Sequence, residues 1–324
     1  MTTTTPTVTA AISSGIGPPP TRQGYQLDVK HVTKRYGRAT VVDDLTFSVP
    51  VGRVTGFLGP NGSGKSTTMK IMLGLASPSS GTVTIGGYRY RQLPDPAGTV
   101  GAIIESDAFH PGRSGRNHLR ILADATGVAY ARVDEVLEQV GLASAAKRRA
   151  GTYSLGMRQR LGLAAALLGD PDVLILDEPG NGLDPQGIRE MRDLLRTHAS
   201  EGGTVLVSSH LLSEVEHLAD DVVVIHQGRL VTHGPLAELQ QTASLVRTHD
   251  PAGLAAVLER SGATTESQGA DRLIVRGMPI DEVGQRAFTA GIPLNELSPR
   301  AGSLEELFLT WTTDPTKKNE VIQL

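Results

Sequence analysis

The residues from Gly59 to Ser66 read Gly-Pro-Asn-Gly-Ser-Gly-Lys-Ser and directly follow the apolar run Val54–Leu58. The spacing G-x-x-x-x-G-K-[ST], between a strand and a helix, is typical of a loop that binds phosphate groups. Successive backbone N–H groups of such a turn point inward and attract an anion, and side chains would block that approach. A Gly-rich turn with an exposed lysine is the alternative, but the flanking strand and helix favour the phosphate loop. Alternation of apolar strands with helices along the chain indicates an α/β core.

The side chains of this loop have distinct predicted roles. The ammonium of Lys65 is expected to contact the β- and γ-phosphates of a nucleotide, and the hydroxyl of Ser66 is expected to bind Mg²⁺. The following helix adds the positive end of its dipole. The predicted nucleotide-binding residues of the loop are Gly59, Pro60, Asn61, Gly62, Ser63, Gly64, Lys65, Ser66 and Thr67.

A second candidate site follows the apolar run Val173–Leu176, which ends in the carboxylates Asp177 and Glu178. Continuous apolar runs are typical of central parallel strands, and ligands of open α/β sheets bind at the carboxyl ends of such strands. We expect Asp177 to hold Mg²⁺ and Glu178 to orient or deprotonate an attacking water. An acidic helix start would explain the pair if it stood alone, but the phosphate loop upstream favours the catalytic interpretation. The two motifs together predict a Mg²⁺-dependent nucleotide hydrolase or kinase.

Hydrophobic periodicity predicts the elements around these motifs. Leu45, Phe47 and Val49 alternate with polar residues, as on a half-buried strand. Helical spacing predicts one helix along Met69, Met72, Leu73 and Ala76, and another along Val133, Val136, Leu137 and Val140, with Gly141 as its C-terminal cap. The runs Val205–Val207 and Val222–Ile225 predict further buried parallel strands.

Four segments are predicted from these patterns. Residues 25–240 form the nucleotide-binding domain, and residues 245–312 form a small α+β accessory domain. The last helix of the accessory domain has the capping box Ser303 with Glu306. Residues 1–24, rich in Thr, Ser, Gly and Pro, are predicted to be a disordered N-terminal tail, and residues 313–324 are predicted to be a C-terminal tail.

Composition excludes several classes of protein. With 39% hydrophobic residues among 324, the chain can bury a sizeable core. The balance of 31 Lys and Arg against 34 Asp and Glu argues against binding nucleic acid by bulk positive charge. The absence of Cys excludes disulfides, thiolate zinc sites and a Cys nucleophile. The longest uncharged apolar candidate, Leu161–Gly169, is far shorter than the roughly 20 residues of a spanning helix, so work at a membrane would require a partner.

Between the two motifs stands the sequence Tyr153-Ser154-Leu155-Gly156-Met157. It resembles the signature sequence of ATP-binding-cassette (ABC) ATPases, whose generic form is Leu-Ser-Gly-Gly-Gln. A helix N-terminus capped by Ser154 can be aimed at a phosphate. In that family the phosphate belongs to ATP held by the opposite subunit, so the resemblance implies two cassettes that enclose two ATPs and contact them through Ser154 and Gly156. A plain helix cap is the alternative role of Ser154.

Other positions match the family one by one. Tyr36 resembles the aromatic residue that stacks on adenine, and an edge-strand tyrosine is its alternative. Asp184 lies in Asn181–Pro185, which resembles the loop that couples the two sites, although a turn into a helix is also consistent. His210 resembles the switch histidine that contacts the γ-phosphate and holds the water-orienting glutamate, against the alternative of a structural histidine.

Two features depart from the generic family. Glu105 stands where the family has Gln, and an ionised carboxylate offers acceptors alone, so we expect it to bind Mg²⁺ more strongly and to join the nucleotide site. Leu155 and Met157 replace Gly and Gln of the signature. Both departures resemble the bacitracin-resistance and lantibiotic-immunity branch of bacterial exporters. The resemblance covers roughly residues 26–240.

The resemblance implies a P-loop NTPase (RecA-like) core with an antiparallel β subdomain and a helical signature subdomain. It implies ATP and Mg²⁺ as ligands, with Glu178, His210 and Lys65 as catalytic residues. The implied function is that of the ATP-hydrolysing subunit of an exporter for an antibiotic, lantibiotic or drug-like molecule. The implied partners are a separate permease, contacted by residues 106–123, and a second copy of the chain. This places the chain at the cytoplasmic face of the membrane, without nucleic acid.

Three alternative functions belong to other classes of protein. A soluble, non-transport ABC-type ATPase that acts as a nucleotide-dependent switch is the main alternative. Chromosome-maintenance ATPases of that kind need a long coiled coil, and the stretch between Lys65 and Asp177 has no room for one. A P-loop kinase would not need the Tyr153–Gln159 motif. In a third alternative, residues 245–311 sense a ligand while the cassette acts only as a switch.

Overall fold

The computed structural model describes residues 22, 24–104, 109–209, 212–240, 243–300 and 308. Glu105, His210 and the Ser303–Glu306 capping box therefore lie outside the described residues, as do nearly all of the two predicted tails. Within the described part of the chain, no helix combines the length and the apolar character needed to cross a lipid bilayer.

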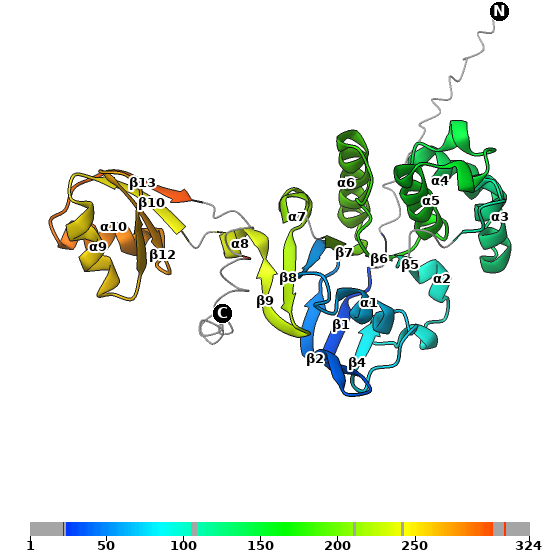
Figure 1. Ribbon diagram of the computed structural model, residues 1–324, viewed down its shortest axis with the longest axis horizontal. Coiled ribbons are helices and arrows are strands. Elements are labelled where there is room, and N and C mark those ends of the chain that lie inside the picture. Colours follow the sequence, from blue (N-terminus) through cyan, green and yellow to red (C-terminus); the bar gives the residue numbers. More distant parts are fainter. Residues whose placement is uncertain are drawn as a thin grey trace, which may run out of the picture.

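A six-stranded sheet with the order β5-β6-β7-β3-β8-β9 forms the centre of the fold (Figure 1). Its first five strands are parallel, and β9 pairs antiparallel with β8 at one edge. The bounds are β3 (Val54–Leu58), β5 (Val100–Ile103), β6 (Val173–Leu176), β7 (Thr204–Ser209), β8 (Asp221–His226) and β9 (Arg229–Pro235). The apolar runs predicted as central strands are β6 and parts of β7 and β8, and every residue of β6 is buried. This confirms the α/β core.

The two faces of the central sheet pack against different layers because successive side chains of a strand point to opposite sides. One face contributes to a core with the helices, through Leu174, Leu176, Val205 and Val207. The other face contributes to a core with an antiparallel sheet and α1, through Phe57, Val173, Ile175 and Leu206. The continuous apolar runs in the sequence follow from burial on both faces.

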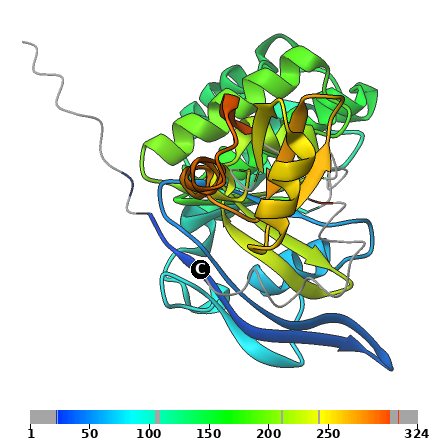
Figure 2. The same ribbon diagram turned by 90° about the vertical axis from the view of Figure 1, so that its left-hand side faces the viewer.

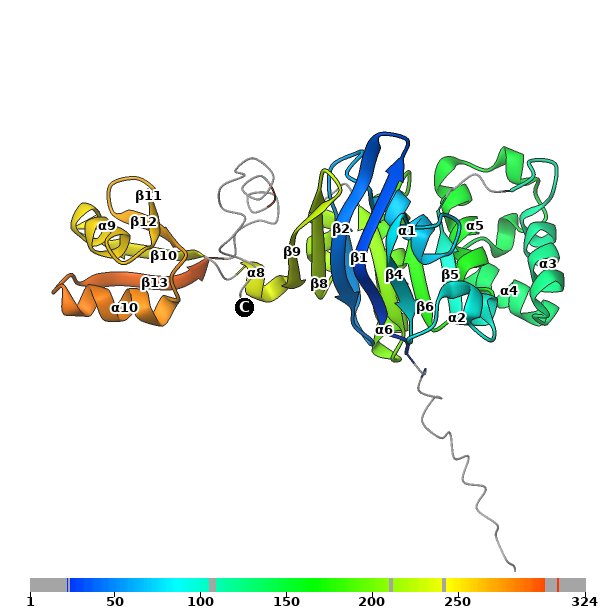
Figure 3. The same ribbon diagram turned by 90° about the horizontal axis from the view of Figure 1, so that it is seen from below.

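The antiparallel sheet has the order β2-β1-β4, with β1 (Leu27–Tyr36), β2 (Ala39–Val49) and β4 (Ser80–Ile85) (Figure 3). Leu45, Phe47 and Val49 are buried while Thr46 and Ser48 are exposed, as their alternation predicts. The long β1–β2 pair is also visible when the molecule is turned by 90° (Figure 2).

Helix α1 (Lys65–Met72) is shorter than its hydrophobic spacing predicts. Gly74 has φ +65°, which ends the helix in a left-handed turn, so Ala76 lies beyond it. Met69 and Met72 are buried in the core between α1 and the antiparallel sheet. The hydrophobic spacing predicts the buried face of the helix correctly, but it does not indicate the residue at which the helix ends.

The predicted helical region consists of three main helices at one end of the molecule, α3 (Gly115–Thr126), α4 (Tyr130–Gln139) and α5 (Leu155–Leu167) (Figure 1). Gly141, φ +71°, follows α4 as the cap that the sequence predicts. Helix α6 (Pro185–Ser200) covers the same face of the central sheet as these helices. The shorter elements are η1 (Tyr90–Gln92), α2 (Pro96–Thr99), η2 (Ala143–Ala145), η3 (Ala150–Thr152), α7 (Leu212–Leu218) and α8 (Leu236–Gln240).

A βαββαβ unit follows α8 at the other end of the molecule (Figures 1 and 3). Its antiparallel sheet has the order β11-β12-β10-β13, which is the split βαβ arrangement of ferredoxin-like folds. Its core, which includes Val246, Leu273 and Val283, is separate from the cores of the cassette. The bounds are β10 (Ala243–Thr248), α9 (Pro251–Glu259), β11 (Thr264–Ser267), β12 (Arg272–Arg276), α10 (Ile280–Thr289) and β13 (Leu294–Arg300). These elements confirm the small α+β fold.

Candidate nucleotide site

The Gly-rich loop connects the end of β3 to the first turn of α1. Gly64 caps α1 with φ 105°, a left-handed conformation that favours glycine. A side chain at Gly59 would place its Cβ 2.5 Å from the Ile225 carbonyl oxygen, and one at Gly64 would come within 2.8 Å of the Val41 carbonyl oxygen. The loop backbone therefore packs against its neighbours as closely as glycine permits, as expected for a Gly-rich turn whose backbone forms a cradle for phosphate.

Lys65 spans this cradle. Its side chain is buried, and its Nζ donates to the carbonyl oxygen of Gly59 at 2.6 Å. Burial lowers the pKa of Lys65 below its usual value, and the nearby carboxylates of Glu178 and Asp177 oppose this shift only in part. The Lys65 ammonium and the acidic pair thus share one site at the carboxyl edge of the sheet. The hydroxyl of Ser63 in the same loop is buried with no hydrogen-bond partner.

The acidic pair is held by a serine from the neighbouring strand. Asp177 directly follows β6, and its N–H donates to the carbonyl oxygen of Ile103 at 2.7 Å. The hydroxyl of Ser208 in β7 donates to Asp177 Oδ1 at 2.5 Å and accepts the N–H of Glu178 at 2.9 Å. Ser208 is completely buried, so both carboxylates have a fixed backbone position. The sequence does not predict this role for Ser208; its available signal is a hydroxyl near the end of a buried strand.

Glu178 has φ 48°, a left-handed conformation that is uncommon for a residue with a side chain. Conformations of this kind cost about 1–3 kcal/mol and concentrate at functional sites. The Nδ2 of Asn181 donates to Glu178 Oε2 at 2.6 Å and fixes the carboxylate from the following loop. The sequence does not predict this second positioning contact either.

The first turn of α5 carries the signature residues. Ser154 caps the helix, and its Oγ accepts the N–H of Met157 at 3.2 Å. Tyr153 is buried and donates its hydroxyl to the carbonyl oxygen of Ala145 at 2.8 Å. Ser154 is exposed and Gly156 is half-buried, so this turn faces solvent from a rigid base.

Asp184 caps α6 through a hydrogen bond from the N–H of Gly187 at 2.9 Å. The alternative weighed for this segment, a turn into the next helix, therefore describes its local structure. Tyr36 ends β1 with 54% of its surface exposed, and Lys34 Nζ lies 4.6 Å from its ring centroid. An exposed aromatic face next to a cation is compatible with stacking on a base. The roles of both residues toward nucleotide stay predictions.

The described donors suit a magnesium nucleotide. Ser66 is exposed in the first turn of α1, and Asp177 uses one carboxylate oxygen for Ser208 and keeps a second oxygen. The described residues contain no cluster of three or more His, Asp or Glu side chains that could hold a metal alone. Mg²⁺ is commonly bound by one or two protein oxygens together with substrate phosphates, and this set fits that pattern. Glu105, the third predicted metal ligand, lies outside the described residues.

Comparison with known proteins gives two family matches. Residues 42–181 match the model of the ABC transporter family. Residues 242–305, which include all of the described βαββαβ unit, match a family described as Domain of unknown function (DUF8746).

Individual relatives are similar over most of the chain. The bacitracin transport ATP-binding protein BcrA of Enterococcus faecalis is 38% identical over 293 residues, which are 88% of this chain and 95% of that protein. The lantibiotic transport ATP-binding protein SrtF of Streptococcus pyogenes is 40% identical over 205 residues, which are 63% of this chain and 89% of that protein. A solved structure of the ATP-binding subunit of an ABC transporter has a TM-score of 0.62 at 27% identity and covers 81% of this chain and 99% of that one.

Proposed function

Because this chain belongs to the ABC transporter family, as an ATP-binding subunit that hydrolyses ATP, we propose that it drives an exporter of bacitracin-like or lantibiotic-like peptide antibiotics. The names of the relatives support this choice of export substrate, since the residues of an ATP site do not contact the transported molecule. The observation that carries the ATPase role is the cluster in which Ser208 and Asn181 hold the acidic pair beside Lys65. The non-transport alternative is not favoured, because the relatives are transport proteins.

In the proposed mechanism, the loop of one subunit binds the triphosphate of ATP through its backbone N–H groups and Lys65. Ser66 and Asp177 would hold Mg²⁺, which neutralises charge on the β- and γ-phosphates when it is bound. Glu178 accepts a proton from the attacking water, with Asn181 holding the carboxylate in position.

We further propose that two cassettes associate around ATP. Ser154 and Gly156 of one subunit then contact the γ-phosphate on the other, because a capped helix start presents its N–H groups to an anion. Hydrolysis removes the phosphate that bridges the subunits. The loss of this contact favours the separated state, and this change drives the permease.

A groove beside α3 is the proposed contact surface for the permease, and it holds the chain peripherally at the membrane. The groove has a volume of about 640 Å³ and is lined mainly by apolar residues from β5, α3 and α5, from η1 and from the segments that follow α1 and precede α3. The lining residues include Leu75, Tyr90, Ile104, Phe109, His118 and Leu122. Leu75 is 68% exposed, which is costly for an isolated chain and suits a helix of a membrane partner. Arg116 of the predicted contact segment instead pairs with Asp134 at 2.9 Å.

Reconstitution with the co-purifying permease in proteoliposomes tests the transport proposal. We expect bacitracin or a lantibiotic to stimulate ATP hydrolysis and to accumulate inside inverted vesicles in the presence of ATP. The Lys65→Ala variant should abolish both signals and weaken ATP binding, because the phosphate cradle loses its cation. Stimulation by neither class of peptide, with basal hydrolysis intact, would refute the export substrate and leave the ATPase role standing.

Glu178→Gln tests the catalytic proposal directly. We expect ATP binding to remain and hydrolysis to fall by at least ~100-fold, because an amide cannot accept the proton of the attacking water. Single-turnover hydrolysis and labelled-ATP titration measure the two steps separately. A rate within a few-fold of the wild type would exclude Glu178 as the general base.

A further inference from the structure

We propose that Leu155 is a positioning residue, matched in size to Gly182, that links the signature turn of a subunit to the Glu178 of the same subunit. The inference rests on the proposed function, in which Ser154 and Gly156 contact ATP on the other subunit. Leu155 is 44% exposed on the first turn of α5, where the generic signature has glycine. The observation that gives Leu155 a role is the contact of its side chain with a neighbouring loop.

The side chain of Leu155 rests on the backbone of the loop after the acidic pair. A Cβ built on Gly182 would collide with Cγ and Cδ2 of Leu155 and would lie 3.0 Å from Leu155 Cβ. In addition, a Cβ on Gly156 would lie 2.7 Å from the carbonyl oxygen of Gly182. Two successive residues of the signature therefore touch Gly182, with no room for even one added methyl group.

Gly182 connects this contact to the catalytic glutamate. The preceding residue, Asn181, donates from Nδ2 to Glu178 Oε2 at 2.6 Å, and the Asn181 N–H donates to the Glu178 carbonyl oxygen at 3.3 Å. The following residue, Leu183, packs against the helical core. A shift of the signature turn pushes on Gly182 between these two anchored neighbours, so it reaches the Glu178 carboxylate through Asn181.

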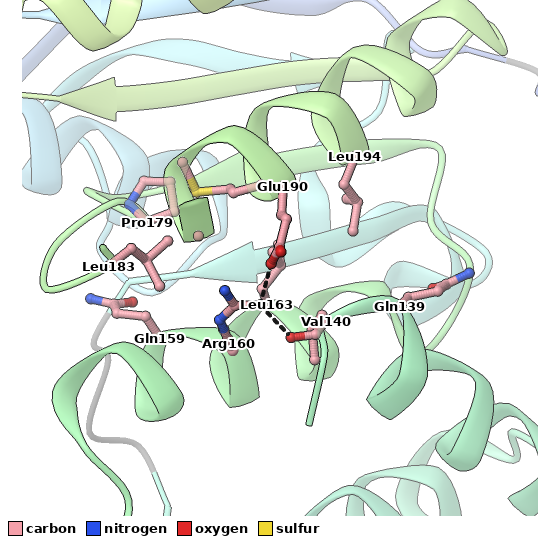
Figure 4. Close-up of a pocket in the computed structure, with 11 residues that line it drawn as sticks. Gln139, Val140, Gln159, Arg160, Leu163, Pro179, Leu183, Glu190 and Leu194 are labelled. Carbon is pink, nitrogen blue, oxygen red and sulfur yellow. Dashed lines mark hydrogen bonds and ion pairs between the residues drawn. The ribbon is translucent and has the colours of Figure 1, made fainter. Parts of the chain in front are cut away.

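A second contact holds α5 at a fixed distance from α6, so the turn cannot relax by sliding away. Arg160 of α5 donates from Nη1 to the Val140 carbonyl oxygen at 2.9 Å and to Glu190 Oε2 of α6 at 2.7 Å (Figure 4). A Cβ on Gly187, in the first turn of α6, would lie 2.9 Å from Arg160 Nη2. The loop that contains Gly182 is thus enclosed by α5, α6 and the Glu178 segment.

The consequence is a short physical path between the two ATP sites of a dimer. ATP of the opposite subunit sets the position of Ser154 and Gly156, and Leu155 transmits that position to Gly182 and Asn181. Correct placement of Glu178 then depends on whether the opposite site holds ATP. A residue with no side chain at position 155 would make this contact only if position 182 carried a side chain instead.

Gly182→Ala, with Gly127→Ala as its matched control, tests the contact. Both glycines have φ +75°, so both variants place a side chain in the left-handed region that favours glycine. Gly127 has no atom within 4 Å of a built Cβ, so only Gly182→Ala meets Leu155. We expect Gly182→Ala to lower kcat for ATP at least tenfold below Gly127→Ala, with KM for ATP changed less than twofold. Adding Leu155→Gly, which removes the colliding atoms and the Cβ, should restore kcat to within about threefold of Gly127→Ala.

The outcomes separate the inference from the function on which it rests. Equal kcat for Gly182→Ala and Gly127→Ala, or no rescue by Leu155→Gly, would overturn the inference while wild-type hydrolysis still supports the ATPase. A Gly182→Ala defect that appears in KM and not in kcat would also overturn it, because the loop would then act on binding. Absence of ATP hydrolysis by the wild-type chain with its permease would overturn both.

Discussion

At the scale of the residue, the site depends on side chains that hold the catalytic groups in position by hydrogen bonds. Ser208 is such a residue, because one hydroxyl joins Asp177 and the backbone of Glu178 across two strands. It also holds Glu178 in its left-handed conformation. The catalytic geometry is therefore built from buried hydrogen bonds as much as from the acidic groups themselves.

Ser208→Ala is expected to lower the rate of ATP hydrolysis about tenfold. The variant removes the hydrogen bonds that Ser208 makes to the Glu178 N–H and to one Asp177 oxygen. A lost buried hydrogen bond of about 1–2 kcal/mol corresponds to roughly a tenfold change in rate. Steady-state kcat measures the effect, and Ser200→Ala, on the exposed end of α6, is the control. Unchanged turnover in Ser208→Ala would show that the acidic pair does not need this hydroxyl.

His198 gives the protein a pH-dependent stability. Burial, with a smaller contribution from Arg22, lowers the pKa of His198 to about 4, although the Asp172 backbone and Asp170 oppose the shift. The folded protein therefore keeps His198 neutral, while the unfolded chain protonates it below about pH 6.5. This contribution to stability is complete above pH 6.5 and is lost as the pH falls toward 4.

We expect the free energy of unfolding to fall across this range by at most about 3 kcal/mol because of His198, at about 1.4 kcal/mol per unit of pKa shift. Urea unfolding at pH 7.0 and at pH 4.5 measures the loss. The His198→Gln variant should show a smaller loss than the wild type, whereas His233→Gln, at an exposed position of β9, should match the wild type. Identical losses in all three proteins would contradict the assignment.

At the scale of the element, three helices meet at Arg160. Its guanidinium satisfies the carbonyl of Val140 at the end of α4 and pairs with Glu190 of α6. The same pairing, together with a hydrogen bond from Gln186, lowers the pKa of Glu190. Gln159 beside it is buried, and its Oε1 has no hydrogen-bond partner (Figure 4). The contacts of the signature helix with α4 and α6 therefore include one charged side chain and one buried amide oxygen that has no hydrogen-bond partner.

A double-mutant cycle on Arg160 and Glu190 tests this dependence. We expect Arg160→Ala to destabilise the protein by about 1–3 kcal/mol, because the Val140 carbonyl loses its donor. Glu190→Ala should cost less than about 1 kcal/mol, since its side chain is 47% exposed and the ion pair is screened. Chemical unfolding measures each term, with Glu135→Ala on the surface of α4 as control. A larger loss in Glu190→Ala than in Arg160→Ala would contradict this order.

At the scale of the whole molecule, the βαββαβ unit has its own core, but a residue that follows it in sequence packs against the cassette. Phe308, which comes after β13, packs against a cluster of the cassette. That cluster includes Val215 of α7, Val222 of β8 and Leu236 of α8. The chain therefore returns to the cassette after completing the accessory unit, close to the helix that follows the His210 position.

Phe308→Ala is expected to destabilise the cassette and not the βαββαβ unit. Loss of a partly buried phenyl ring should cost about 1–2 kcal/mol, which is below the value for a fully buried one. Thermal unfolding with and without ATP identifies the cassette transition, because ligand raises its midpoint. Phe288→Ala, at an 88% exposed position of α10, is the control and should leave that midpoint unchanged. A shift confined to the transition that ATP does not move would contradict the assignment.

Much of the architecture was predictable because its causes are local in sequence. The alternation at Leu45–Val49, the apolar run Val173–Leu176 and the spacing Gly59–Ser66 each specify an element or a turn over a few residues. Parallel strands place their carboxyl ends at one edge, so the acidic pair and the phosphate loop were expected to meet. The signature turn was also predictable, because the cap formed by Ser154 depends only on the residues that directly follow it. The domain boundaries and the roles of the site residues toward ATP remain predictions.

The positioning contacts were decided by tertiary structure alone. Ser208 meets Asp177, Leu155 meets Gly182 and Arg160 meets Glu190 across segments that are distant in sequence. No periodicity encodes such pairs, because they depend on how the sheet order and the helix packing bring side chains within a few ångströms. The sequence by itself thus determined which chemical groups the protein carries and at which edge of the sheet they stand. The packed fold determined which neighbours hold those groups in position, because a contact between distant segments forms only when every layer between them is in place.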